Sequence, residues 1–409
     1  MYWLKPDMRP TKSKRWSDRA LLFRAASEMQ AVKALTWDHP RGYNALAAAA
    51  KLPIVNNSGL DILWQKQPLE GFESHPIADL CARYDLVVLD HPHVGEAISS
   101  NCLHSLEEVF GAQTIAELGE VSIGPSLTSY RFGGKHWALP LDAATQVMAL
   151  RPDIADDIPV TWDEVLRLSQ RSGKVALSLA GPHACLSFLS IAAAHGEPPA
   201  EADPDILVSE TVGRQVYGLM AELAARSPAS VRQMNPIGLL GHMGQNEDVA
   251  LCPLVYGYVN YAAPQSGRTI MFQNAPRAAV GGRPGSTLGG TGIGISRRCN
   301  VTPQLKSHLL WLMGHEAQSR FIPDHDGQPS RRDVWHDDRV NRQWADFYRN
   351  TADTLEQAYV RPRHDGYIAF QGKASAMLRA AFDERRPAPA VLNELQSLYA
   401  ASRVRGGER

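Results

Sequence analysis

Residues 85–90 (DLVVLD) form a run that is apolar at every position between its two aspartates. A strand that is apolar on both faces has to be covered on both faces, as the strands of parallel sheets are. Further strands are expected at 31–36 and from 62–64 onward, with helices over 43–52 and 76–84. This alternation of strands and helices predicts a parallel sheet and therefore an α/β fold.

Length and composition narrow the class of protein. A chain of 409 residues should divide into about two domains. The net charge of −1 excludes the strong field of a nucleic-acid-binding or membrane-surface protein. No apolar run reaches the length of about 18 residues that a membrane span requires. The cysteines are scattered, without metal-site spacing, and are interpreted as small buried side chains: Cys81, Cys102, Cys185, Cys252 and Cys299.

Residues 1–30 are interpreted as an N-terminal extension. They carry several lysines and arginines, and their apolar run at 20–23 is too short for the core of a secretory signal. Three explanations stay open: a wrongly chosen start, an unusual export signal, or a protein that remains in the cytoplasm.

Several short motifs follow one another along the chain. WDHPRGY occupies residues 37–43, directly after the first expected strand, and GGKHWALP at 133–140 predicts a hairpin. Thr161 and Glu164 have the spacing of a helix-capping box. LGGTGIGIS at 288–296 is expected to end in a strand, and a pair of helices joined by a Pro-rich segment closes the chain.

In this order the motifs resemble those of the family 1 extracellular solute-binding proteins of carbohydrate type, the capture subunits of ABC importers. The resemblance covers most of residues 31–400. It implies a two-lobed α/β fold of the type II periplasmic-binding-protein kind, with hinged lobes and a ligand cleft between them. The first lobe would take residues 31–140 and 270–325. The second would take residues 141–269 and 326–409, including the C-terminal helices.

The same resemblance implies a function. A monomer in the periplasm would capture a small carbohydrate-like ligand, a sugar or a sugar-derived compound, by lobe closure and deliver it to the permease subunits of an ABC transporter. No cofactor, metal, catalytic residue or nucleic-acid partner is expected. Two other hypotheses stay open: an enzyme on the same fold, with Cys252 as the nucleophile to test, and a cytoplasmic sensor or scaffold.

The turn after the first strand supplies the first candidate ligand contacts. In open α/β sheets such a turn faces the ligand crevice. Asp38 can accept protons from sugar hydroxyls, Arg41 can donate in a fixed fork, and aromatic rings stack on sugars. The candidates are Trp37, Asp38, His39, Arg41 and Tyr43. The alternative is that Trp37 belongs to the core and Arg41 caps surface carbonyls.

The turn after residues 85–90 should lie beside the first, because neighbouring parallel strands end at one edge of the sheet. It carries Asp90, His91 and His93. Together with Asp38 and His39 these side chains suit either hydrogen bonding to a polyol or a zinc ion. The polyol is favoured, because the helical i, i+4 pairs and CxxC turns of zinc sites are absent from the sequence. The histidines alternatively satisfy backbone groups.

The remaining candidates follow from the resemblance. The second lobe would contribute aromatic residues at the end of a strand over 249–261, and the Gly-rich run 285–294 lacks the order of a phosphate-binding loop. A strand over 269–276 would return the chain to the first lobe. The candidates are Asp142, Tyr256, Tyr258, Asn260, Gly290, Thr291 and Arg331. The alternatives are a helix cap for Asp142, a core role for the tyrosines and a solvated charge for Arg331.

Overall fold

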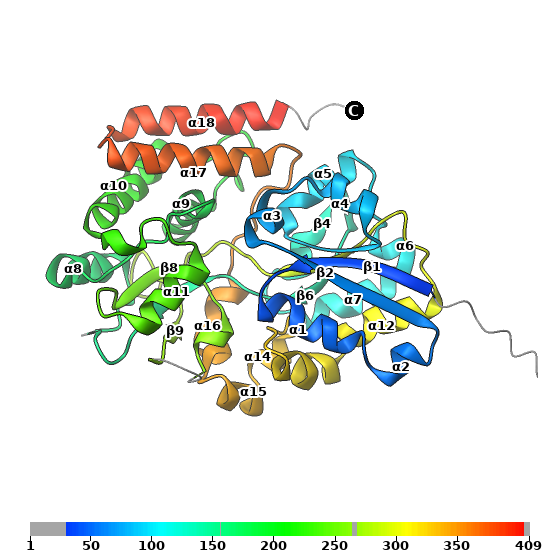
Figure 1. The fold of residues 1–409 in the computed structure, drawn as a ribbon. Helices are drawn as coiled ribbons and strands as arrows, with labels where there is room; N and C mark the ends of the chain where they lie inside the picture. The colour runs from blue at the N-terminus through cyan, green and yellow to red at the C-terminus, as the bar shows by residue number, and fades with distance from the viewer. Residues whose placement is uncertain (1–29, 156, 264–267, 405–409) are drawn as a thin grey trace, which may run out of the picture.

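The computed structural model describes residues 30–155, 157–263 and 268–404 and shows an α/β molecule of two lobes (Figure 1). The first lobe lies on the right of Figure 1 and the second on the left, with the C-terminal helices α17 (Tyr367–Asp383) and α18 (Ala388–Val404) across the top of the second. The expected N-terminal extension lies outside the described residues except for Gln30, which begins β1. None of the described helices is long and apolar enough to cross a membrane.

The first lobe is built on a five-stranded sheet of order β2-β1-β3-β10-β6. Strands β1, β2 and β3 are parallel, as expected, whereas β10 is antiparallel to β3 and to β6. The strands are β1 (Gln30–Trp37), β2 (Leu60–Gln67), β3 (Leu86–Leu89), β6 (Leu139–Asp142) and β10 (Thr291–Ile295). The predicted strands at 31–36, 62–64 and 85–90 are therefore confirmed.

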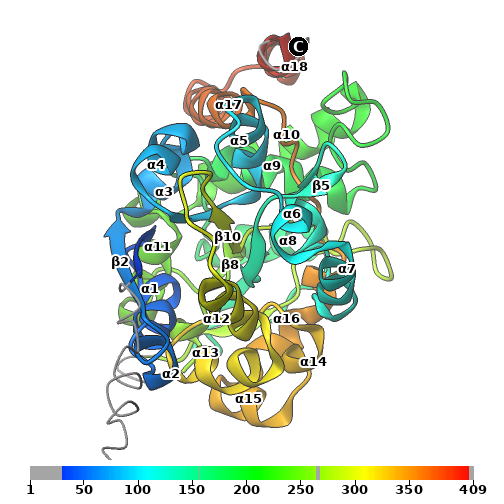
Figure 2. The same ribbon diagram turned by 90° about the vertical axis from the view of Figure 1, so that its right-hand side faces the viewer.

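Alternate residues of β3 face two different apolar clusters, as the two-residue period of a strand requires. Leu86 and Val88 join the cluster under α1 and α12, whereas Val87 and Leu89 join the cluster under α4 and α5. All four residues of β3 are buried. Figure 2 looks onto this lobe and shows helices on both sides of the sheet. The apolar run at 85–90 is thus explained by cover on both faces.

The helices of the first lobe are mostly short. Helix α1 begins where His39 Nδ1 accepts a hydrogen bond from the Arg41 backbone N–H, with Pro40 at the first helical position. The predicted hairpin is confirmed as β4 (Arg131–Phe132) and β5 (Lys135–His136). The helices are α1 (Pro40–Ala49), α2 (Pro53–Asn56), α3 (Leu69–Ser74), α4 (Ile77–Arg83), α5 (Val94–Ser99), α6 (Leu106–Phe110), α7 (Ala112–Val121), α12 (Pro303–Met313) and α13 (Ile322–Asp324).

The second lobe has a smaller sheet of order β8-β7-β9, with both neighbours antiparallel to β7. Its strands are β7 (Gln146–Leu150), β8 (Leu251–Tyr256) and β9 (Met271–Gln273). Helix α8 (Trp162–Ser172) begins with the predicted capping box, in which the side chains of Thr161 and Glu164 each accept from the other's backbone N–H. The other helices from α9 onward are α9 (His183–Ala194), α10 (Glu210–Arg226), α11 (Pro236–Gln245), α14 (Arg332–Trp335), α15 (Asp338–Gln343), α16 (Phe347–Glu356), α17 (Tyr367–Asp383) and α18 (Ala388–Val404).

One predicted boundary is wrong. The strand expected at 269–276 exists as β9, but it pairs with β7 in the second sheet and does not return the chain to the first lobe. The chain re-enters the first sheet only at β10, where Thr291 pairs opposite Asp142. The error arose because a short apolar strand carries no sign of which sheet it will join.

The chain crosses between the sheets at residues 143–145 and 287–290, which run side by side. The Gly289 N–H donates to the Ala144 carbonyl, and Thr145 bridges to Leu288. Gly290 has φ +85°, and a Cβ at this position would collide with the Asp142 carbonyl oxygen, so the crossing requires glycine here.

A third segment, residues 357–366 between α16 and α17, also joins the lobes. The Tyr359 N–H donates to the Ser286 carbonyl, while Arg363 donates to backbone carbonyls of Thr128, Ser129 and Arg131 in the first lobe. We refer to residues 357–366 as the strap.

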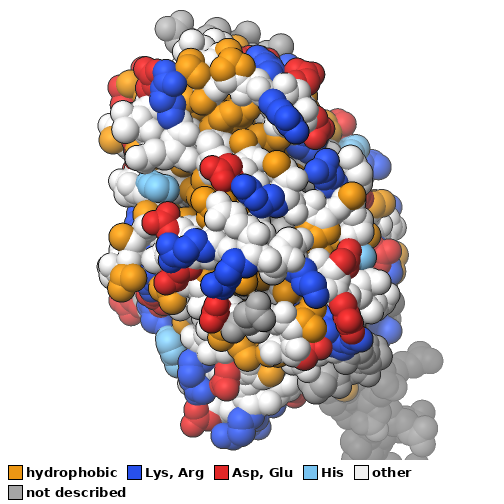
Figure 3. Space-filling model, turned by 90° about the vertical axis from the view of Figure 1, so that its left-hand side faces the viewer, with side chains coloured by type: hydrophobic (Ala, Val, Ile, Leu, Met, Phe, Trp, Pro, Cys, Tyr) orange, Lys and Arg blue, Asp and Glu red, His pale blue; other side chains and the backbone are white. Residues whose placement is uncertain are grey.

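On the outer face of the second lobe, acidic and basic side chains are interspersed (Figure 3), in keeping with the net charge of −1.

Candidate functional site

The predicted turns of the first lobe lie against the strand end of the second lobe. The Arg41 Nη1 donates to the Gly257 carbonyl oxygen at 3.0 Å, directly after β8. The Tyr258 ring meets the Trp37 ring edge-on, and the two ring centroids are 6.0 Å apart. The candidates from the two halves of the sequence, more than 200 positions apart, therefore meet at one interface between the lobes.

Arg41 and Asp142 bind each other in the middle of this interface. The Nε of Arg41 donates to Asp142 Oδ2 at 2.7 Å, and Nη2 donates to Oδ1, which makes the pair bidentate. Both side chains are about 95% buried. Burial acts to lower the pKa of Arg41, but Asp142 outweighs it and raises this pKa. Both residues were predicted to contact a ligand, but they hydrogen-bond each other instead. Through Arg41 the pair connects the end of β6 with the chain after β8.

Trp37, His39 and Tyr258 form an aromatic group beside this ion pair. His39 stacks on Trp37 at 5.2 Å with an interplanar angle of 8°, and Tyr258 meets His39 edge-on at 4.9 Å. Burial and the Arg41 charge lower the pKa of His39 to about 4, so its ring is neutral at pH 7. The Trp37 Nε1 is buried and has no hydrogen-bond partner among the described residues. The indole packs closely on Gly42 of the same turn.

Asp38 and Tyr43 lie on the outer side of the same turn. Asp38 is exposed and pairs with Lys66 at 2.6 Å, and the Lys66 ammonium lies 4.9 Å from the centre of the Tyr43 ring. The structure therefore does not bring these two candidates to the buried part of the interface.

Asp90 is held by an arginine that sequence reasoning missed. The Nη2 of Arg361, from the strap, donates to Asp90 Oδ2, and the same guanidinium donates to the Leu288 carbonyl and to Gln371. Burial acts to raise the pKa of Asp90, but Arg361 and His91 outweigh it and hold this pKa well below its usual range. Asp90 is therefore a carboxylate with its charge balanced inside the protein.

His91 and His93 are buried behind Asp90. Neither ring has a hydrogen-bond partner among the residues that the structure describes, although His91 Nδ1 comes within 3.1 Å of Asp90 Oδ1. Burial and Arg361 lower the pKa of His91 to about 4, and burial also lowers the pKa of His93. Both rings are thus neutral at pH 7.

Two residues that were not predicted, Glu73 and His183, face each other across the lobes. His183 begins α9 in the second lobe, is 2% exposed, and places Nε2 3.6 Å from Glu73 Oε1 at the end of α3. Burial, together with Asp90 and Glu70, raises the pKa of Glu73 to about 8. Burial and Arg361 lower the pKa of His183 to about 3. Neither nitrogen of His183 has a partner in the described part of the chain.

The structure places Tyr256 next to His183 and leaves Asn260 further along the interface. The two rings of Tyr256 and His183 meet edge-on at 5.8 Å, and the Tyr256 hydroxyl reaches Thr287 Oγ1 and the Leu288 carbonyl only at 3.4 Å. Asn260 Nδ2 lies 3.4 Å from the Asp326 carbonyl, and its Oδ1 is buried with no partner in residues 30–155, 157–263 and 268–404.

The last three candidates have roles within the protein. Gly290 allows the close crossing described above, and Thr291 lies in the β10–β6 ladder opposite Asp142. Arg331 forms an ion pair with Asp333 at 2.8 Å. No hydrogen bond or ion pair within residues 30–155, 157–263 and 268–404 links Arg331 to the other candidates.

Cys252, the nucleophile of the enzyme hypothesis, lies inside the second lobe. It is 0% exposed, and burial raises the pKa of its thiol to about 12. Since the thiolate is the nucleophile, this cysteine is inert at neutral pH. For the zinc alternative, no group of three or more His, Cys, Asp or Glu side chains in the described residues is arranged to hold a metal ion.

Comparisons with known proteins identify the fold. No protein-family model and no curated protein matches the sequence. Among solved structures, a ribitol-bound ABC transporter solute-binding protein from Agrobacterium radiobacter K84 shares 19% identity at TM-score 0.74, over 91% of this chain and 98% of that chain. Maltose-bound MalE3 of T. maritima shares 16% at TM-score 0.74, over 90% and 98%.

A D-mannitol-bound solute-binding protein from Agrobacterium vitis S4 shares 14% identity at TM-score 0.68, over 92% of this chain and 99% of that chain. These matches confirm the predicted two-lobed solute-binding-protein fold over nearly the whole of the described chain.

Proposed function

We propose that this protein is the substrate-binding component of an ABC importer and captures a sugar or polyol between its two lobes. One observation carries the proposal most strongly. His183 is buried, neither of its ring nitrogens has a hydrogen-bond partner within the described chain, and the partly exposed Glu73 faces it across the lobes at 3.6 Å. Buried polar groups are normally hydrogen-bonded, so a buried histidine without partners favours a guest that supplies them.

The chemistry around this pair suits hydroxyl groups. A hydroxyl donates one hydrogen bond and accepts others. Glu73, whose raised pKa favours the protonated form at neutral pH, offers one O–H donor and a carbonyl acceptor, and neutral His183 offers one donor and one acceptor. The rings of Trp37, Tyr256 and Tyr258 add flat apolar surface, which matches the apolar face of a sugar ring. The ligands named for the similar structures, ribitol, maltose and D-mannitol, are all polyhydroxylated and uncharged.

Lobe closure follows from the position of these groups. Because Glu73 and Trp37 belong to the first lobe and His183 and Tyr258 to the second, a ligand that binds all of them holds the lobes together. This is hinge closure of the kind found in periplasmic binding proteins. The permease subunits would then recognise the closed form at the outer face of the membrane. This step requires the protein to be in the periplasm.

The proposal is tested by a thermal-shift screen of the full chain against ribitol, D-mannitol, maltose and related sugars and polyols. A ligand that binds the folded state raises the melting temperature by mass action. In the variants Glu73→Gln and His183→Ala we expect the affinity for the best ligand to fall about tenfold or more, as for a hydrogen bond worth about 1.5 kcal/mol. His315→Ala, at an exposed histidine paired with Asp333, is the matched control and should bind as the wild type does.

Two outcomes would contradict the proposal. One is the absence of any saturable shift across the screen. The other is a ligand whose affinity is the same in the wild type, in Glu73→Gln and in His183→Ala, because such a ligand would bind elsewhere.

A further inference from the structure

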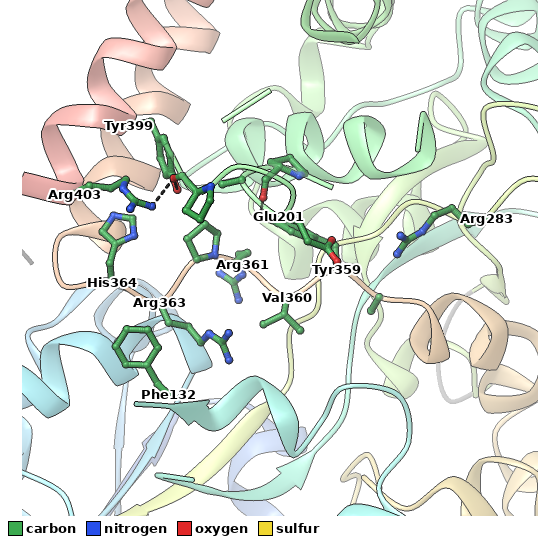
Figure 4. A pocket seen from close by; sticks show the side chains of 15 residues that line it. Phe132, Glu201, Arg283, Tyr359, Val360, Arg361, Arg363, His364, Tyr399 and Arg403 are labelled. Carbon is green, nitrogen blue, oxygen red and sulfur yellow. Dashed lines mark hydrogen bonds between the residues drawn. The ribbon is translucent and has the colours of Figure 1, made fainter. Parts of the chain in front are cut away.

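A cavity of about 670 Å³ lies on the strap, away from the Glu73–His183 pair. Its wall on the first-lobe side includes Phe132 of β4, and its wall on the second-lobe side includes Tyr399 and Arg403 of α18 (Figure 4). The strap itself forms the floor from Ala358 to His364. The cavity therefore spans the seam between the two lobes.

Arginines dominate the polar lining of this cavity. Arg283, Arg361, Arg363 and Arg403 all line it, against the single carboxylate of Glu201. Two of the four have their charge balanced elsewhere: Arg361 pairs with Asp90, and Arg403 pairs with Asp205 at 3.1 Å. The other two, Arg283 and Arg363, form no ion pair with any carboxylate of the described residues.

Arg363 is a partly buried cation held in a fixed position. Its Nη1 donates to three backbone carbonyls of the first lobe at 2.8–3.2 Å, while its Nε is buried without a partner among the described residues. Burial lowers the pKa of Arg363, and no carboxylate counters this effect. A guanidinium removed from water without a counter-charge is costly unless a ligand supplies that charge.

Arg283 presents a second cation from the other lobe. Its Nη2 donates to the Gln357 carbonyl, which fixes the side chain, and in the part of the chain that the structure describes its Nε is also buried without a partner. In Figure 4 the side chains of Arg283 and Arg363 lie on opposite sides of Tyr359 and Val360, and each extends toward these two residues. The two arginines that have no ion pair among the described residues therefore line one cavity from opposite sides.

We propose that this cavity binds a small organic molecule with two or more anionic groups, which bridges Arg363 on the first-lobe side to Arg283 on the second. Planar guanidinium groups bind carboxylates and phosphates in a matching fork. The apolar lining of Phe132, Pro199 and Val360 suits the carbon skeleton of such an anion. The site is separate from the one proposed for the sugar or polyol.

The test is isothermal titration of the full chain at low ionic strength with citrate and, separately, with fructose 1,6-bisphosphate. The two probes distinguish polycarboxylates from phosphate esters, and acetate is the monovalent control. We expect saturable binding of at least one probe, weakened about tenfold or more in Arg283→Gln and in Arg363→Gln. Arg379→Gln is the matched control, because Arg379 also lacks an ion pair and donates to backbone carbonyls, but lies outside the cavity.

Absence of saturable binding by both probes up to about 10 mM would overturn the proposal. So would equal binding in the wild type and in Arg283→Gln, which remains a valid test if Arg363→Gln fails to fold. Binding of acetate as tight as that of citrate would also overturn it, since no bridge is then formed. Because neither arginine contacts the Glu73–His183 pair, a failure here leaves the sugar or polyol site untouched, and the converse also holds.

Discussion

Glu73 and His183 lie 3.6 Å apart, one from each lobe, and the burial of both makes each of them prefer its uncharged form. Both pKa shifts disfavour a salt bridge between them at neutral pH. They favour a protonated carboxyl group and a neutral imidazole where the two lobes meet. This state follows from the pKa of Glu73, which is raised from 4.5 to about 8, and that of His183, which is lowered from 6.5 to about 3.

The raised pKa of Glu73 predicts a dependence of stability on pH. Between its ordinary pKa of 4.5 and the raised value of about 8, the folded protein holds a proton that the unfolded chain has lost. The contribution of Glu73 to the free energy of unfolding therefore decreases as the pH rises through this range. Denaturant unfolding at about pH 5 and about pH 9 should show a smaller decrease for Glu73→Gln than for the wild type. Identical pH profiles for the two proteins would show that Glu73 is solvated.

Arg41→Met should destabilise the protein by about 3–5 kcal/mol, because it leaves the buried Asp142 carboxylate without its counter-charge. The same removal at an exposed pair, Arg171→Met opposite Asp157, should cost less than about 1 kcal/mol. Denaturant unfolding measures both values. A loss in Arg41→Met no greater than that in Arg171→Met would mean that the Arg41–Asp142 pair is open in solution.

The sequence was sufficient to predict the three parallel strands of the first sheet and the turns at their ends, but not the antiparallel pairing of β10 with β3 and β6. Residues 85–90 were recognisable because every position is apolar, and the capping box of α8 because it depends on two residues close together. The meeting of the turn at 37–43 with Tyr258 was also predicted, although on the resemblance rather than on local pattern.

The partners of the charged side chains were beyond prediction. Arg41 was expected to contact a ligand, but its guanidinium donates to Asp142, which lies 101 positions away in the sequence. His183 escaped notice because all twelve residues of α9 are buried, so the helix lacks the polar face that gives an amphipathic period. Glu73 lies in a six-residue helix and shows nothing unusual until the second lobe covers it.

Gly290→Ala should be far more damaging than Gly133→Ala, although both glycines have positive φ. At Gly133 nothing lies within 4 Å of an added Cβ, so only the left-handed conformation is penalised, by about 1–2 kcal/mol. At Gly290 the added Cβ also collides with the Asp142 carbonyl, at the crossing between the lobes. Thermal unfolding should show at least about 2 kcal/mol of further loss. Equal losses would indicate that the crossing adjusts freely.

Thiol titration of the native protein should modify Cys102 first, because it is half-buried whereas Cys81, Cys185, Cys252 and Cys299 are buried. Burial also raises the pKa of Cys185, Cys252 and Cys299 to about 12, which suppresses their thiolates. These cysteines should react only after denaturation. Rapid modification of Cys252 in the native protein would restore it as a candidate nucleophile.

The most direct measurement is a crystal structure of the protein with the tightest-binding sugar or polyol from the thermal-shift screen. The account predicts electron density for that ligand at the interface of the two lobes, beside Trp37 and Tyr258 and within hydrogen-bond distance of Glu73 and His183. A complex in which the ligand occupies any other part of the molecule, without contact to Glu73 or His183, would contradict it.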